Sequence, residues 1–255
     1  PDGAVLEAAG EALRISADRI HGGWGNGPKF PHAMAIEFLL RRYLAAGDYD
    51  LLETARRVLD AMARGGIYDQ LGGGFHRYAV DDHWAVPHFE KMLYDNALLA
   101  RTYLHAWQVT WDPFYRIITE ETLDYVLREM VAPTGGFYST QDADVAGDEG
   151  GYYLWTAAEV NALLGEDAPL FTAVYRVTEP GNFDGRNTLT FEGDLEQRMA
   201  LTPSRALLLV ARERRPRPGR DEKVLASWNG LMIAALAEAG AALDRPDYRA
   251  AAERA

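Results

Sequence analysis

The chain has 255 residues, no cysteine, and a net charge of −12 from 26 basic and 38 acidic side chains. This length suffices for one large domain with a substantial core. An acidic chain without a basic run is unsuited to bind nucleic acid or an anionic membrane surface. The lack of cysteine excludes disulfides, thiolate metal sites and thiol chemistry within these residues, and it agrees with the cytoplasmic location that we expect. No apolar run reaches the roughly eighteen residues that span a bilayer.

Apolar residues recur at helical spacing along most of the chain. Pro87 suits the first turn of a helix, where its missing N–H costs nothing, so a helix is expected to begin there. Strand-like pieces are few, at residues 151–155 and 188–191. Helices are predicted over residues 4–17, 32–46, 50–64, 87–110, 113–130, 157–164, 168–175, 195–214 and 224–243, and from 246 onward.

The sequence also repeats itself at an offset of 133 residues, which places Asn96 on Asn229 and Tyr115 on Tyr248. Paired helices at a regular period are typical of a repeat architecture. Glycine-aromatic loops recur after predicted helices, at residues 22–25, 65–68 and 135–138.

The predicted helices after Pro87 and after Val224 are apolar on nearly every side, which indicates that they are buried all round. An inner helix of an open solenoid faces solvent on one side, so a closed ring is favoured. We therefore predict an all-α fold, an (α/α)6 toroid of helical hairpins, formed by residues 1–255 as a single domain. About ten helices are predicted where six hairpins need twelve, and the chain begins without methionine, so we expect a fragment whose ring is incomplete at the C-terminus.

The most polar and aromatic stretch of the chain is residues 65–99, which holds His76, His83 and His88 within thirteen positions. Its first part has many glycines and no helical period, which is typical of a long loop. A loop of this kind that leads into a helix either carries chemistry or plugs the end of a helical bundle.

Several motifs resemble the signature blocks of one family, the thioredoxin-domain-containing proteins of the spermatogenesis-associated protein 20 type. The resemblance implies an N-terminal thioredoxin-like domain, which this chain lacks, followed by an (α/α)6 domain similar to N-acylglucosamine 2-epimerases and six-hairpin glycosidases. It also implies the thioredoxin-like domain of the full-length polypeptide as a partner. The matching blocks are residues 28–31 (PKFP), 68–78 (YDQLGGGFHRY), 87–96 (PHFEKMLYDN), 136–139 (GFYS), 142–144 (DAD), 181–183 (GNF), 221–223 (DEK) and 227–230 (SWNG).

Only three of the 26 basic residues are lysines, Lys29, Lys91 and Lys223, and each lies between a loop and the start of an apolar helix. Lys91 and Lys223 are separated by nearly the repeat offset. We therefore expect the three ammonium groups to border one mouth of the ring, contacting an anionic substrate or the nearby carboxylates Glu90, Asp95 and Glu222. The alternative is chance placement on exposed helix starts.

For catalysis, His88 is the first candidate base, because a helix N-terminus disfavours imidazolium and a neutral imidazole can abstract a proton alpha to a carbonyl. His76 is the second candidate. Hydrolysis of a glycosidic bond instead needs two carboxylates, for which Glu90, Asp95 and Asp142 are candidates. Each of these residues has a purely structural alternative, as a cap or an ion-pair partner.

Aromatic rings in loops and helix starts suit a carbohydrate, whose apolar faces stack on such rings. No motif indicates a metal or a cofactor, and the calcium-like segment 142–149 fails because Ala146 and Tyr153 occupy ligand positions. Two functions stay open, an enzyme acting on a small carbohydrate and a non-catalytic binding or scaffold module. Both require segments 87–96 and 141–144 to lie together. The candidate substrate contacts are Lys29, Tyr68, Asp69, Arg77, Lys91, Asn96, Asp144, Trp228 and Asn229.

Overall fold

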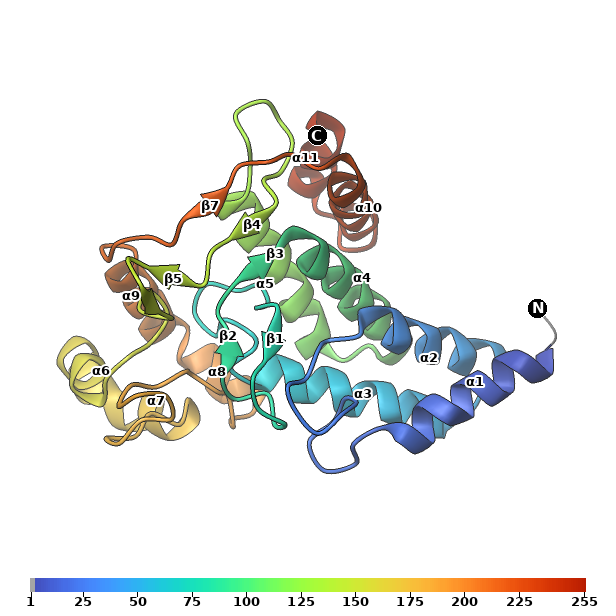
Figure 1. The fold of residues 1–255 in the computed structure, drawn as a ribbon, viewed down its shortest axis with the longest axis horizontal. Helices are drawn as coiled ribbons and strands as arrows, with labels where there is room; N and C mark the ends of the chain where they lie inside the picture. Colours follow the sequence, from blue (N-terminus) through green and yellow to red (C-terminus); the bar gives the residue numbers. More distant parts are fainter. Residues whose placement is uncertain (1–2) are drawn as a thin grey trace.

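The computed structural model describes residues 3–255, which are mostly helical (Figure 1). The strands contain two residues each and form small antiparallel pairings. No helix in residues 3–255 is long and apolar enough to cross a membrane. The helices are α1 (Gly3–Ser16), α2 (Ala33–Ala46), α3 (Tyr49–Arg64), α4 (Leu93–Thr110), α5 (Pro113–Glu129), α6 (Ala157–Leu164), the 3₁₀ turn η1 (Gly165–Asp167), α7 (Ala168–Val174), α8 (Leu195–Ala200), α9 (Thr202–Arg212), α10 (Ala226–Ala242) and α11 (Pro246–Arg254). The strands are β1 (Tyr78–Ala79), β2 (Pro87–His88), β3 (Lys91–Met92), β4 (Thr140–Gln141), β5 (Asp144–Val145), β6 (Asp148–Glu149) and β7 (Arg220–Asp221).

Local sequence sets where the helices begin and end. The side chain of Asp48 accepts a hydrogen bond from the N–H of Asp50 at the start of α3, and Asp112 does the same for Phe114 in α5. Gly47 ends α2 in the left-handed conformation, at φ 72°, which a residue without a Cβ adopts readily. These short connections fold α2 with α3, and α4 with α5, into antiparallel hairpins.

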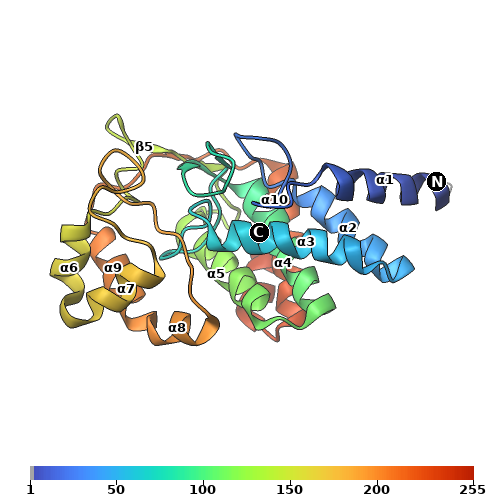
Figure 2. The ribbon, with the colours of Figure 1, turned by 90° about the horizontal axis from the view of Figure 1, so that it is seen from below.

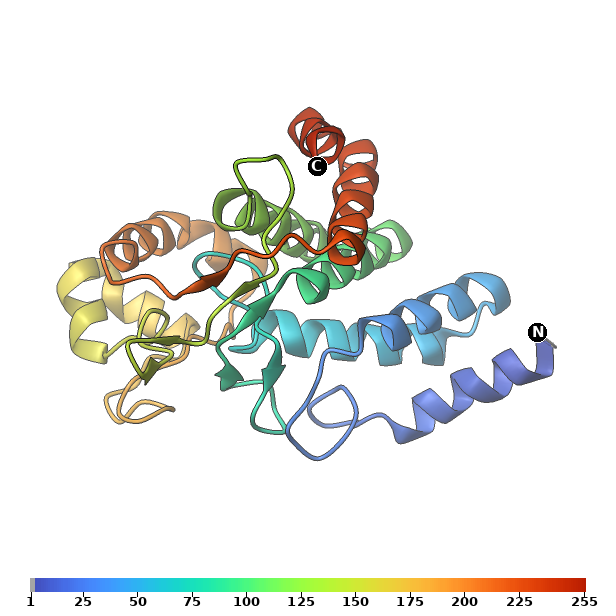
Figure 3. The ribbon, with the colours of Figure 1, turned by 45° about the horizontal axis from the view of Figure 1, so that its top comes forward.

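The hairpins α2/α3, α4/α5 and α10/α11 follow one another around an arc. α2 and α10 both pack on α4, and Figures 1 and 3 show α4 between them. We call α2, α4 and α10 the inner helices, and α3, α5 and α11 the outer ones. The predicted fold of helical hairpins is confirmed. The described residues contribute three such hairpins to the toroid, and residues 131–225 do not form a further one.

The sequence repeat has a structural basis in two asparagines, Asn96 and Asn229, each the fourth residue of an inner helix. Oδ1 of Asn96 accepts the N–H of Phe75 at 2.7 Å, and its Nδ2 donates to the carbonyl of Phe75 at 3.0 Å. Asn229 binds Phe137 in the same way, at 2.7 and 3.0 Å. Each asparagine therefore clamps the glycine-phenylalanine loop that precedes its helix.

A second repeated contact joins the outer helices. The hydroxyl of Tyr115 in α5 donates to Asp60 in α3 at 2.8 Å, and that of Tyr248 in α11 donates to Asp124 in α5 at 2.7 Å. Tyr49, which a half-offset of 66 residues places in the same series, is exposed at the start of α3. The repeat thus marks bonds between successive hairpins.

Residues 131–225 form a lobe on one side of the arc, which contains α6 to α9 (Figures 1 and 2). Its helices share a hydrophobic core with α2 and α3, through Trp155, Phe171 and Leu208 among others. Residues 195–214, predicted as one helix, are divided at Leu201 into α8 and α9, since Pro203 suits the first turn of a new helix. The predicted strand pieces reduce to one bridge, between Trp155 and Asn187.

Three arginines of α8 and α9 attach the lobe to the arc. Arg198 and Arg205 donate to the carboxylate of Glu121 in α5 at 2.6 and 2.9 Å. Both guanidinium Nη atoms of Arg212 donate to Asp69 at 2.8 Å. The three arginines are buried and lie seven residues apart, so they form one stripe along the two helices.

The prediction that a helix begins at Pro87 is wrong. Residues 87–88 pair with β1, residues 91–92 pair with β4, and α4 begins at Leu93. The N–H of Leu93 donates to the carbonyl of Ser139, and the carbonyl of Glu90 accepts from Arg77. These cross-chain bonds hold the segment extended, because they use backbone groups that a helix would need. His88 consequently lies outside the field of a helix N-terminus.

Candidate functional site

The pairing of β3 with β4 brings the two motif-rich segments together. Lys91 lies opposite Gln141, and Met92 lies opposite Thr140, which in turn pairs with Asp221 of β7. The prediction that segments 87–96 and 141–144 are neighbours is confirmed. Both lie beside the start of the inner helix α4.

Six polar residues around the start of α4, which we call the entry cluster, interact at the surface: Arg77, His88, Glu90, Tyr94, Asp95 and Glu149. Nη1 of Arg77 donates to Oε2 of Glu90 at 2.9 Å. Nδ1 of His88 lies 2.9 Å from Oε1 of Glu149, and its Nε2 lies 3.9 Å from Oε2 of Glu90. His88 is therefore held between two carboxylates from β6 and from the turn before β3.

Asp95 differs from the other carboxylates of the entry cluster. Burial raises the pKa of Asp95 to about 7; the Tyr94 hydroxyl and the Arg77 guanidinium lower it, and the charge of Glu90 raises it further. Its Oδ2 is buried without a hydrogen-bond partner, and so is Nε of Arg77. The cluster thus contains one unpartnered acceptor and one unpartnered donor, a pair that a hydroxyl group of a ligand would satisfy.

Aromatic rings border the entry cluster on two sides. Phe30 stacks on Tyr78 with ring centres 4.9 Å apart, and Tyr78 stacks on His88 at 5.1 Å. On the other side Tyr94 contacts Trp228 of α10 at 4.8 Å. Phe30 is 43% exposed, so one ring face remains available for stacking.

The buried carboxylate Asp69 belongs to a separate group beneath the surface. It binds Lys91 at 2.9 Å and Arg212 at 2.8 Å, and these cations hold the pKa of Asp69 well below its usual value although burial opposes this. Burial lowers the pKa of Lys91 to about 8. The two cavities at this group measure about 20 and 10 Å³, which is space for one water molecule at most. These residues form an ionic core that joins the lobe to the loop.

His76 and Tyr68 also lie inside the protein. Nδ1 of His76 lies 2.9 Å from the carbonyl of Phe89, and the ring packs against Phe89 and Tyr153. Burial holds the pKa of His76 well below its usual value, so the ring is neutral. The hydroxyl of Tyr68 donates to Glu121 at 2.6 Å. Neither side chain reaches the entry cluster.

The prediction that three lysines border one mouth is wrong. Lys29 is fully buried and donates to Asp18 and to the carbonyl of Gly22. Lys91 binds Asp69, as described above, and Lys223 is exposed and pairs with Asp221 at 2.9 Å. A buried ammonium needs a carboxylate, so each lysine has a partner close to it in the fold rather than a shared ligand.

The two aspartates of the 141–144 segment are exposed. Asp142 contributes its backbone N–H to a bond with Gly219, and the carboxylate of Asp144 accepts from Gly147 in the β5–β6 turn. The charged groups that shift the pKa of Asp95 are Arg77 and Glu90. The structure therefore combines His88, Glu90, Arg77 and Asp95 with Trp228 nearby.

Two members of the entry cluster, Tyr94 and Glu149, were not among the predicted site residues. Glu149 is distant in sequence and reaches His88 only through the β5–β6 hairpin. The arginine stripe was also missed, although its seven-residue spacing is visible in the sequence.

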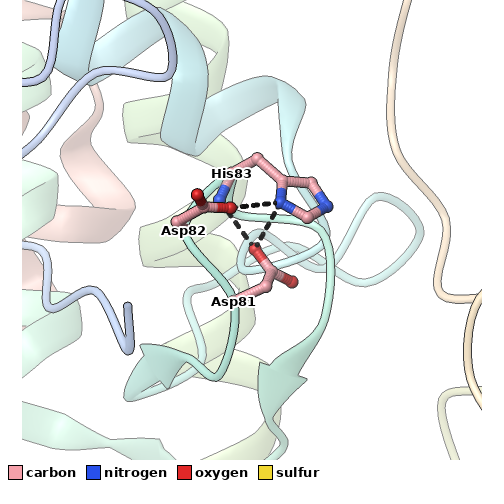
Figure 4. Close-up of side chains that lie close together, drawn as sticks. All are labelled: Asp81, Asp82 and His83. Atoms are coloured by element: carbon pink, nitrogen blue, oxygen red, sulfur yellow. Dashed lines mark hydrogen bonds and ion pairs between the residues drawn. The ribbon is translucent and has the colours of Figure 1, made fainter. Parts of the chain in front are cut away.

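Asp81, Asp82 and His83 lie together on the loop between β1 and β2 (Figure 4). Nδ1 of His83 lies 2.8 Å from Asp82 and 3.5 Å from Asp81. Asp81 already accepts backbone N–H bonds from His83, Ala85 and Val86. Within residues 3–255 this is the one group with the spacing of metal ligands, and the bonds of Asp81 explain it as a closed loop.

A further histidine connects the three inner helices. Nδ1 of His105 in α4 lies 2.8 Å from Glu37 in α2, and its Nε2 lies 3.2 Å from Glu238 in α10. Arg101 also binds Glu238, at 2.6 and 2.9 Å. The hydrogen bond to Glu37 is the largest of the effects that raise the pKa of His105.

No protein-family model matches the chain. Spermatogenesis-associated protein 20 of Homo sapiens is 38% identical over 268 aligned residues, which cover 89% of this chain and 34% of the relative. By sequence, the chain belongs to the spermatogenesis-associated protein 20 family. An uncharacterised protein of Caenorhabditis elegans is 31% identical, over 94% of this chain and 38% of that protein. The chain thus spans about a third of the length of the relatives it matches.

Among solved structures, a sugar epimerase from a ruminal bacterium superposes with a TM-score of 0.50 at 12% identity, covering 98% of this chain and 84% of the epimerase. The cellobiose 2-epimerase of Spirochaeta thermophila gives a TM-score of 0.46 at 13% identity, covering 100% of this chain and 85% of that one. At such identity the first likeness shows the fold alone. The chain has the (α/α)6 helical-hairpin fold that carbohydrate-active enzymes share.

Proposed function

We propose that the entry cluster binds a small carbohydrate and transfers a proton on it, as in epimerisation or aldose–ketose isomerisation. The observation that carries this proposal is the unpartnered pair, Oδ2 of Asp95 and Nε of Arg77, beside exposed aromatic rings. A sugar supplies both of the surfaces that this arrangement lacks. Its hydroxyls donate and accept hydrogen bonds, and its apolar face stacks on aromatic rings.

The chemistry needs a group that can accept and return a proton near neutral pH. A carboxyl with a pKa of about 7 meets this requirement, because both protonation states are populated. Asp95 would take the proton from the carbon next to the carbonyl of the open-chain sugar. His88, held by Glu149, would return a proton at the other face or at the carbonyl oxygen, while Arg77 orients that oxygen.

Exchange with solvent deuterium tests this proposal. The protein is incubated in D₂O with a panel of aldoses and ketoses, and NMR follows deuterium incorporation at the carbon beside the carbonyl. We expect exchange with at least one sugar and its loss in Asp95→Asn, by about a hundredfold or more. The matched control Asp184→Asn, at an exposed aspartate of the lobe, should exchange at the wild-type rate. Sugar binding without exchange in the wild-type protein contradicts the catalytic role.

A non-catalytic binding or scaffold module is the second candidate function. It is supported by the mutual pairing of Arg77 with Glu90 and of His88 with Glu149, since paired groups are less free to react. In this case the domain would serve a thioredoxin-like domain in the same full-length polypeptide. Sugar-dependent thermal stabilisation of the protein without any exchange would favour this function.

A further inference from the structure

The charges of the entry cluster restrict the ligands that it can take. Three carboxylates, of Glu90, Asp95 and Glu149, face two basic groups, Arg77 and His88. Arg77 is bound to Glu90 and His88 is bound to Glu149. No basic group in the cluster is left to neutralise an anionic ligand, and Asp95 adds negative charge whenever it ionises.

The surroundings of the cluster do not correct this imbalance. All three lysines are paired with Asp18, Asp69 and Asp221, and two of them are buried. The β5–β6 hairpin that carries Glu149 adds the exposed carboxylate of Asp144, and its Asp148 is paired with Arg186 of the lobe. A ligand therefore approaches a surface of excess negative charge.

We propose that the entry cluster selects sugars that carry no phosphate or carboxylate, and that it binds a protonated amino sugar more tightly than the neutral parent sugar. This inference rests on the proposed function. An ammonium group donates three hydrogen bonds, one of which Oδ2 of Asp95 can accept, and the carboxylates of Glu90 and Glu149 lie around it. A phosphate brings two negative charges to the same carboxylates, which repel it.

The test compares three ligands of one ring geometry: glucosamine, glucose and glucose 6-phosphate, with the corresponding mannose series in parallel. Dissociation constants are measured by NMR titration of the protein at pH 7 in low salt. We expect glucosamine or mannosamine to bind about fivefold more tightly than the neutral sugar, which is the size of one partly exposed ion pair. The phosphorylated sugar should bind at least about tenfold more weakly than the neutral one.

Two comparisons separate charge selection from a general preference. In 0.5 M NaCl, where the screening length is only a few ångström, the amino-sugar advantage should shrink. In Glu149→Gln it should fall towards onefold, whereas Glu166→Gln, at an exposed glutamate of the lobe, should keep the wild-type ratio. A phosphorylated sugar that binds as tightly as the neutral sugar overturns the inference and leaves the proposed function standing. Absence of binding by all six ligands overturns both.

Discussion

Asp69 and Asp95 lie in the same motif-rich stretch, and their surroundings give them opposite properties. Burial raises the pKa of both carboxyls. Asp69 has Lys91 and Arg212 within 2.9 Å, and these cations reverse the effect of burial. Asp95 has no such partner at its Oδ2, so the effect of burial remains. The partners of a buried carboxyl, more than its burial, decide whether it stabilises the fold or is free to exchange a proton.

The largest expected effect is on stability, from Asp69→Asn. This change leaves Lys91 and Arg212 buried without a counter-charge, so we expect a loss of about 3–5 kcal/mol in the free energy of unfolding. Urea denaturation measures it, with Asp184→Asn as a control that should change little. A loss below about 1 kcal/mol for Asp69→Asn contradicts the role of this group as an ionic core.

Asn229→Ala removes the clamp at the start of α10. The N–H and carbonyl of Phe137 then lose their partners, and Leu225 loses one bond, so we expect destabilisation by about 2–3 kcal/mol. Asn96→Ala should have a similar effect, because Asn96 makes the same bonds with Phe75. The exposed Asn26 provides the control, as Asn26→Ala. If Asn96→Ala and Asn229→Ala leave the urea midpoint unchanged, the repeat has another cause.

Asp95→Asn should act in the opposite direction from Asp69→Asn. The folded protein binds the proton of Asp95 more tightly than the unfolded chain does, so the wild-type protein loses stability as the pH rises from about 4 to about 7. The neutral amide lacks this loss. We expect Asp95→Asn to be more stable than wild type at pH 8 by at least about 1 kcal/mol, and the difference to vanish near pH 4. Urea curves at the two pH values measure this, and a destabilised variant at pH 8 argues against an unpartnered carboxylate.

His105→Gln should have the smallest effect. The raised pKa of His105 means that its ion pairs contribute stability below the ordinary histidine pKa of about 6.5, and that this contribution is lost as the pH rises through the folded value. The pairs are partly exposed, so we expect a change of about 1 kcal/mol or less, seen at pH 5.5 and absent at pH 9. Thermal unfolding at both pH values tests this. An effect that is equal at both values would assign His105 a packing role instead.

The sequence predicts the hairpins and the neighbouring positions of segments 87–96 and 141–144, because helical periodicity and the motif blocks are properties of short stretches. It does not predict the extended course of residues 87–92. That conformation depends on β4, some fifty residues away, whose backbone competes successfully with the local signal of Pro87.

The candidate site was predicted only in part for a related reason. His88, Glu90, Arg77 and Asp95 meet at the surface, whereas Lys91, Asp69 and His76 are drawn into the interior by Arg212 and the tyrosines of the lobe. Residue type and spacing do not distinguish a carboxylate that a distant arginine will neutralise from one that stays unpaired. The arginine stripe that makes this difference becomes meaningful only when α8 and α9 are placed against α5.

The most direct test of the account is an NMR titration that follows the side-chain carboxyl carbons of Asp95 and Asp69 in the same sample. The account predicts that Asp95 titrates near pH 7 and that Asp69 remains ionised well below the ordinary aspartate pKa of about 3.9. A midpoint for Asp95 near 4 or lower would contradict the account, because the carboxylate would then have a partner and no proton to exchange at neutral pH.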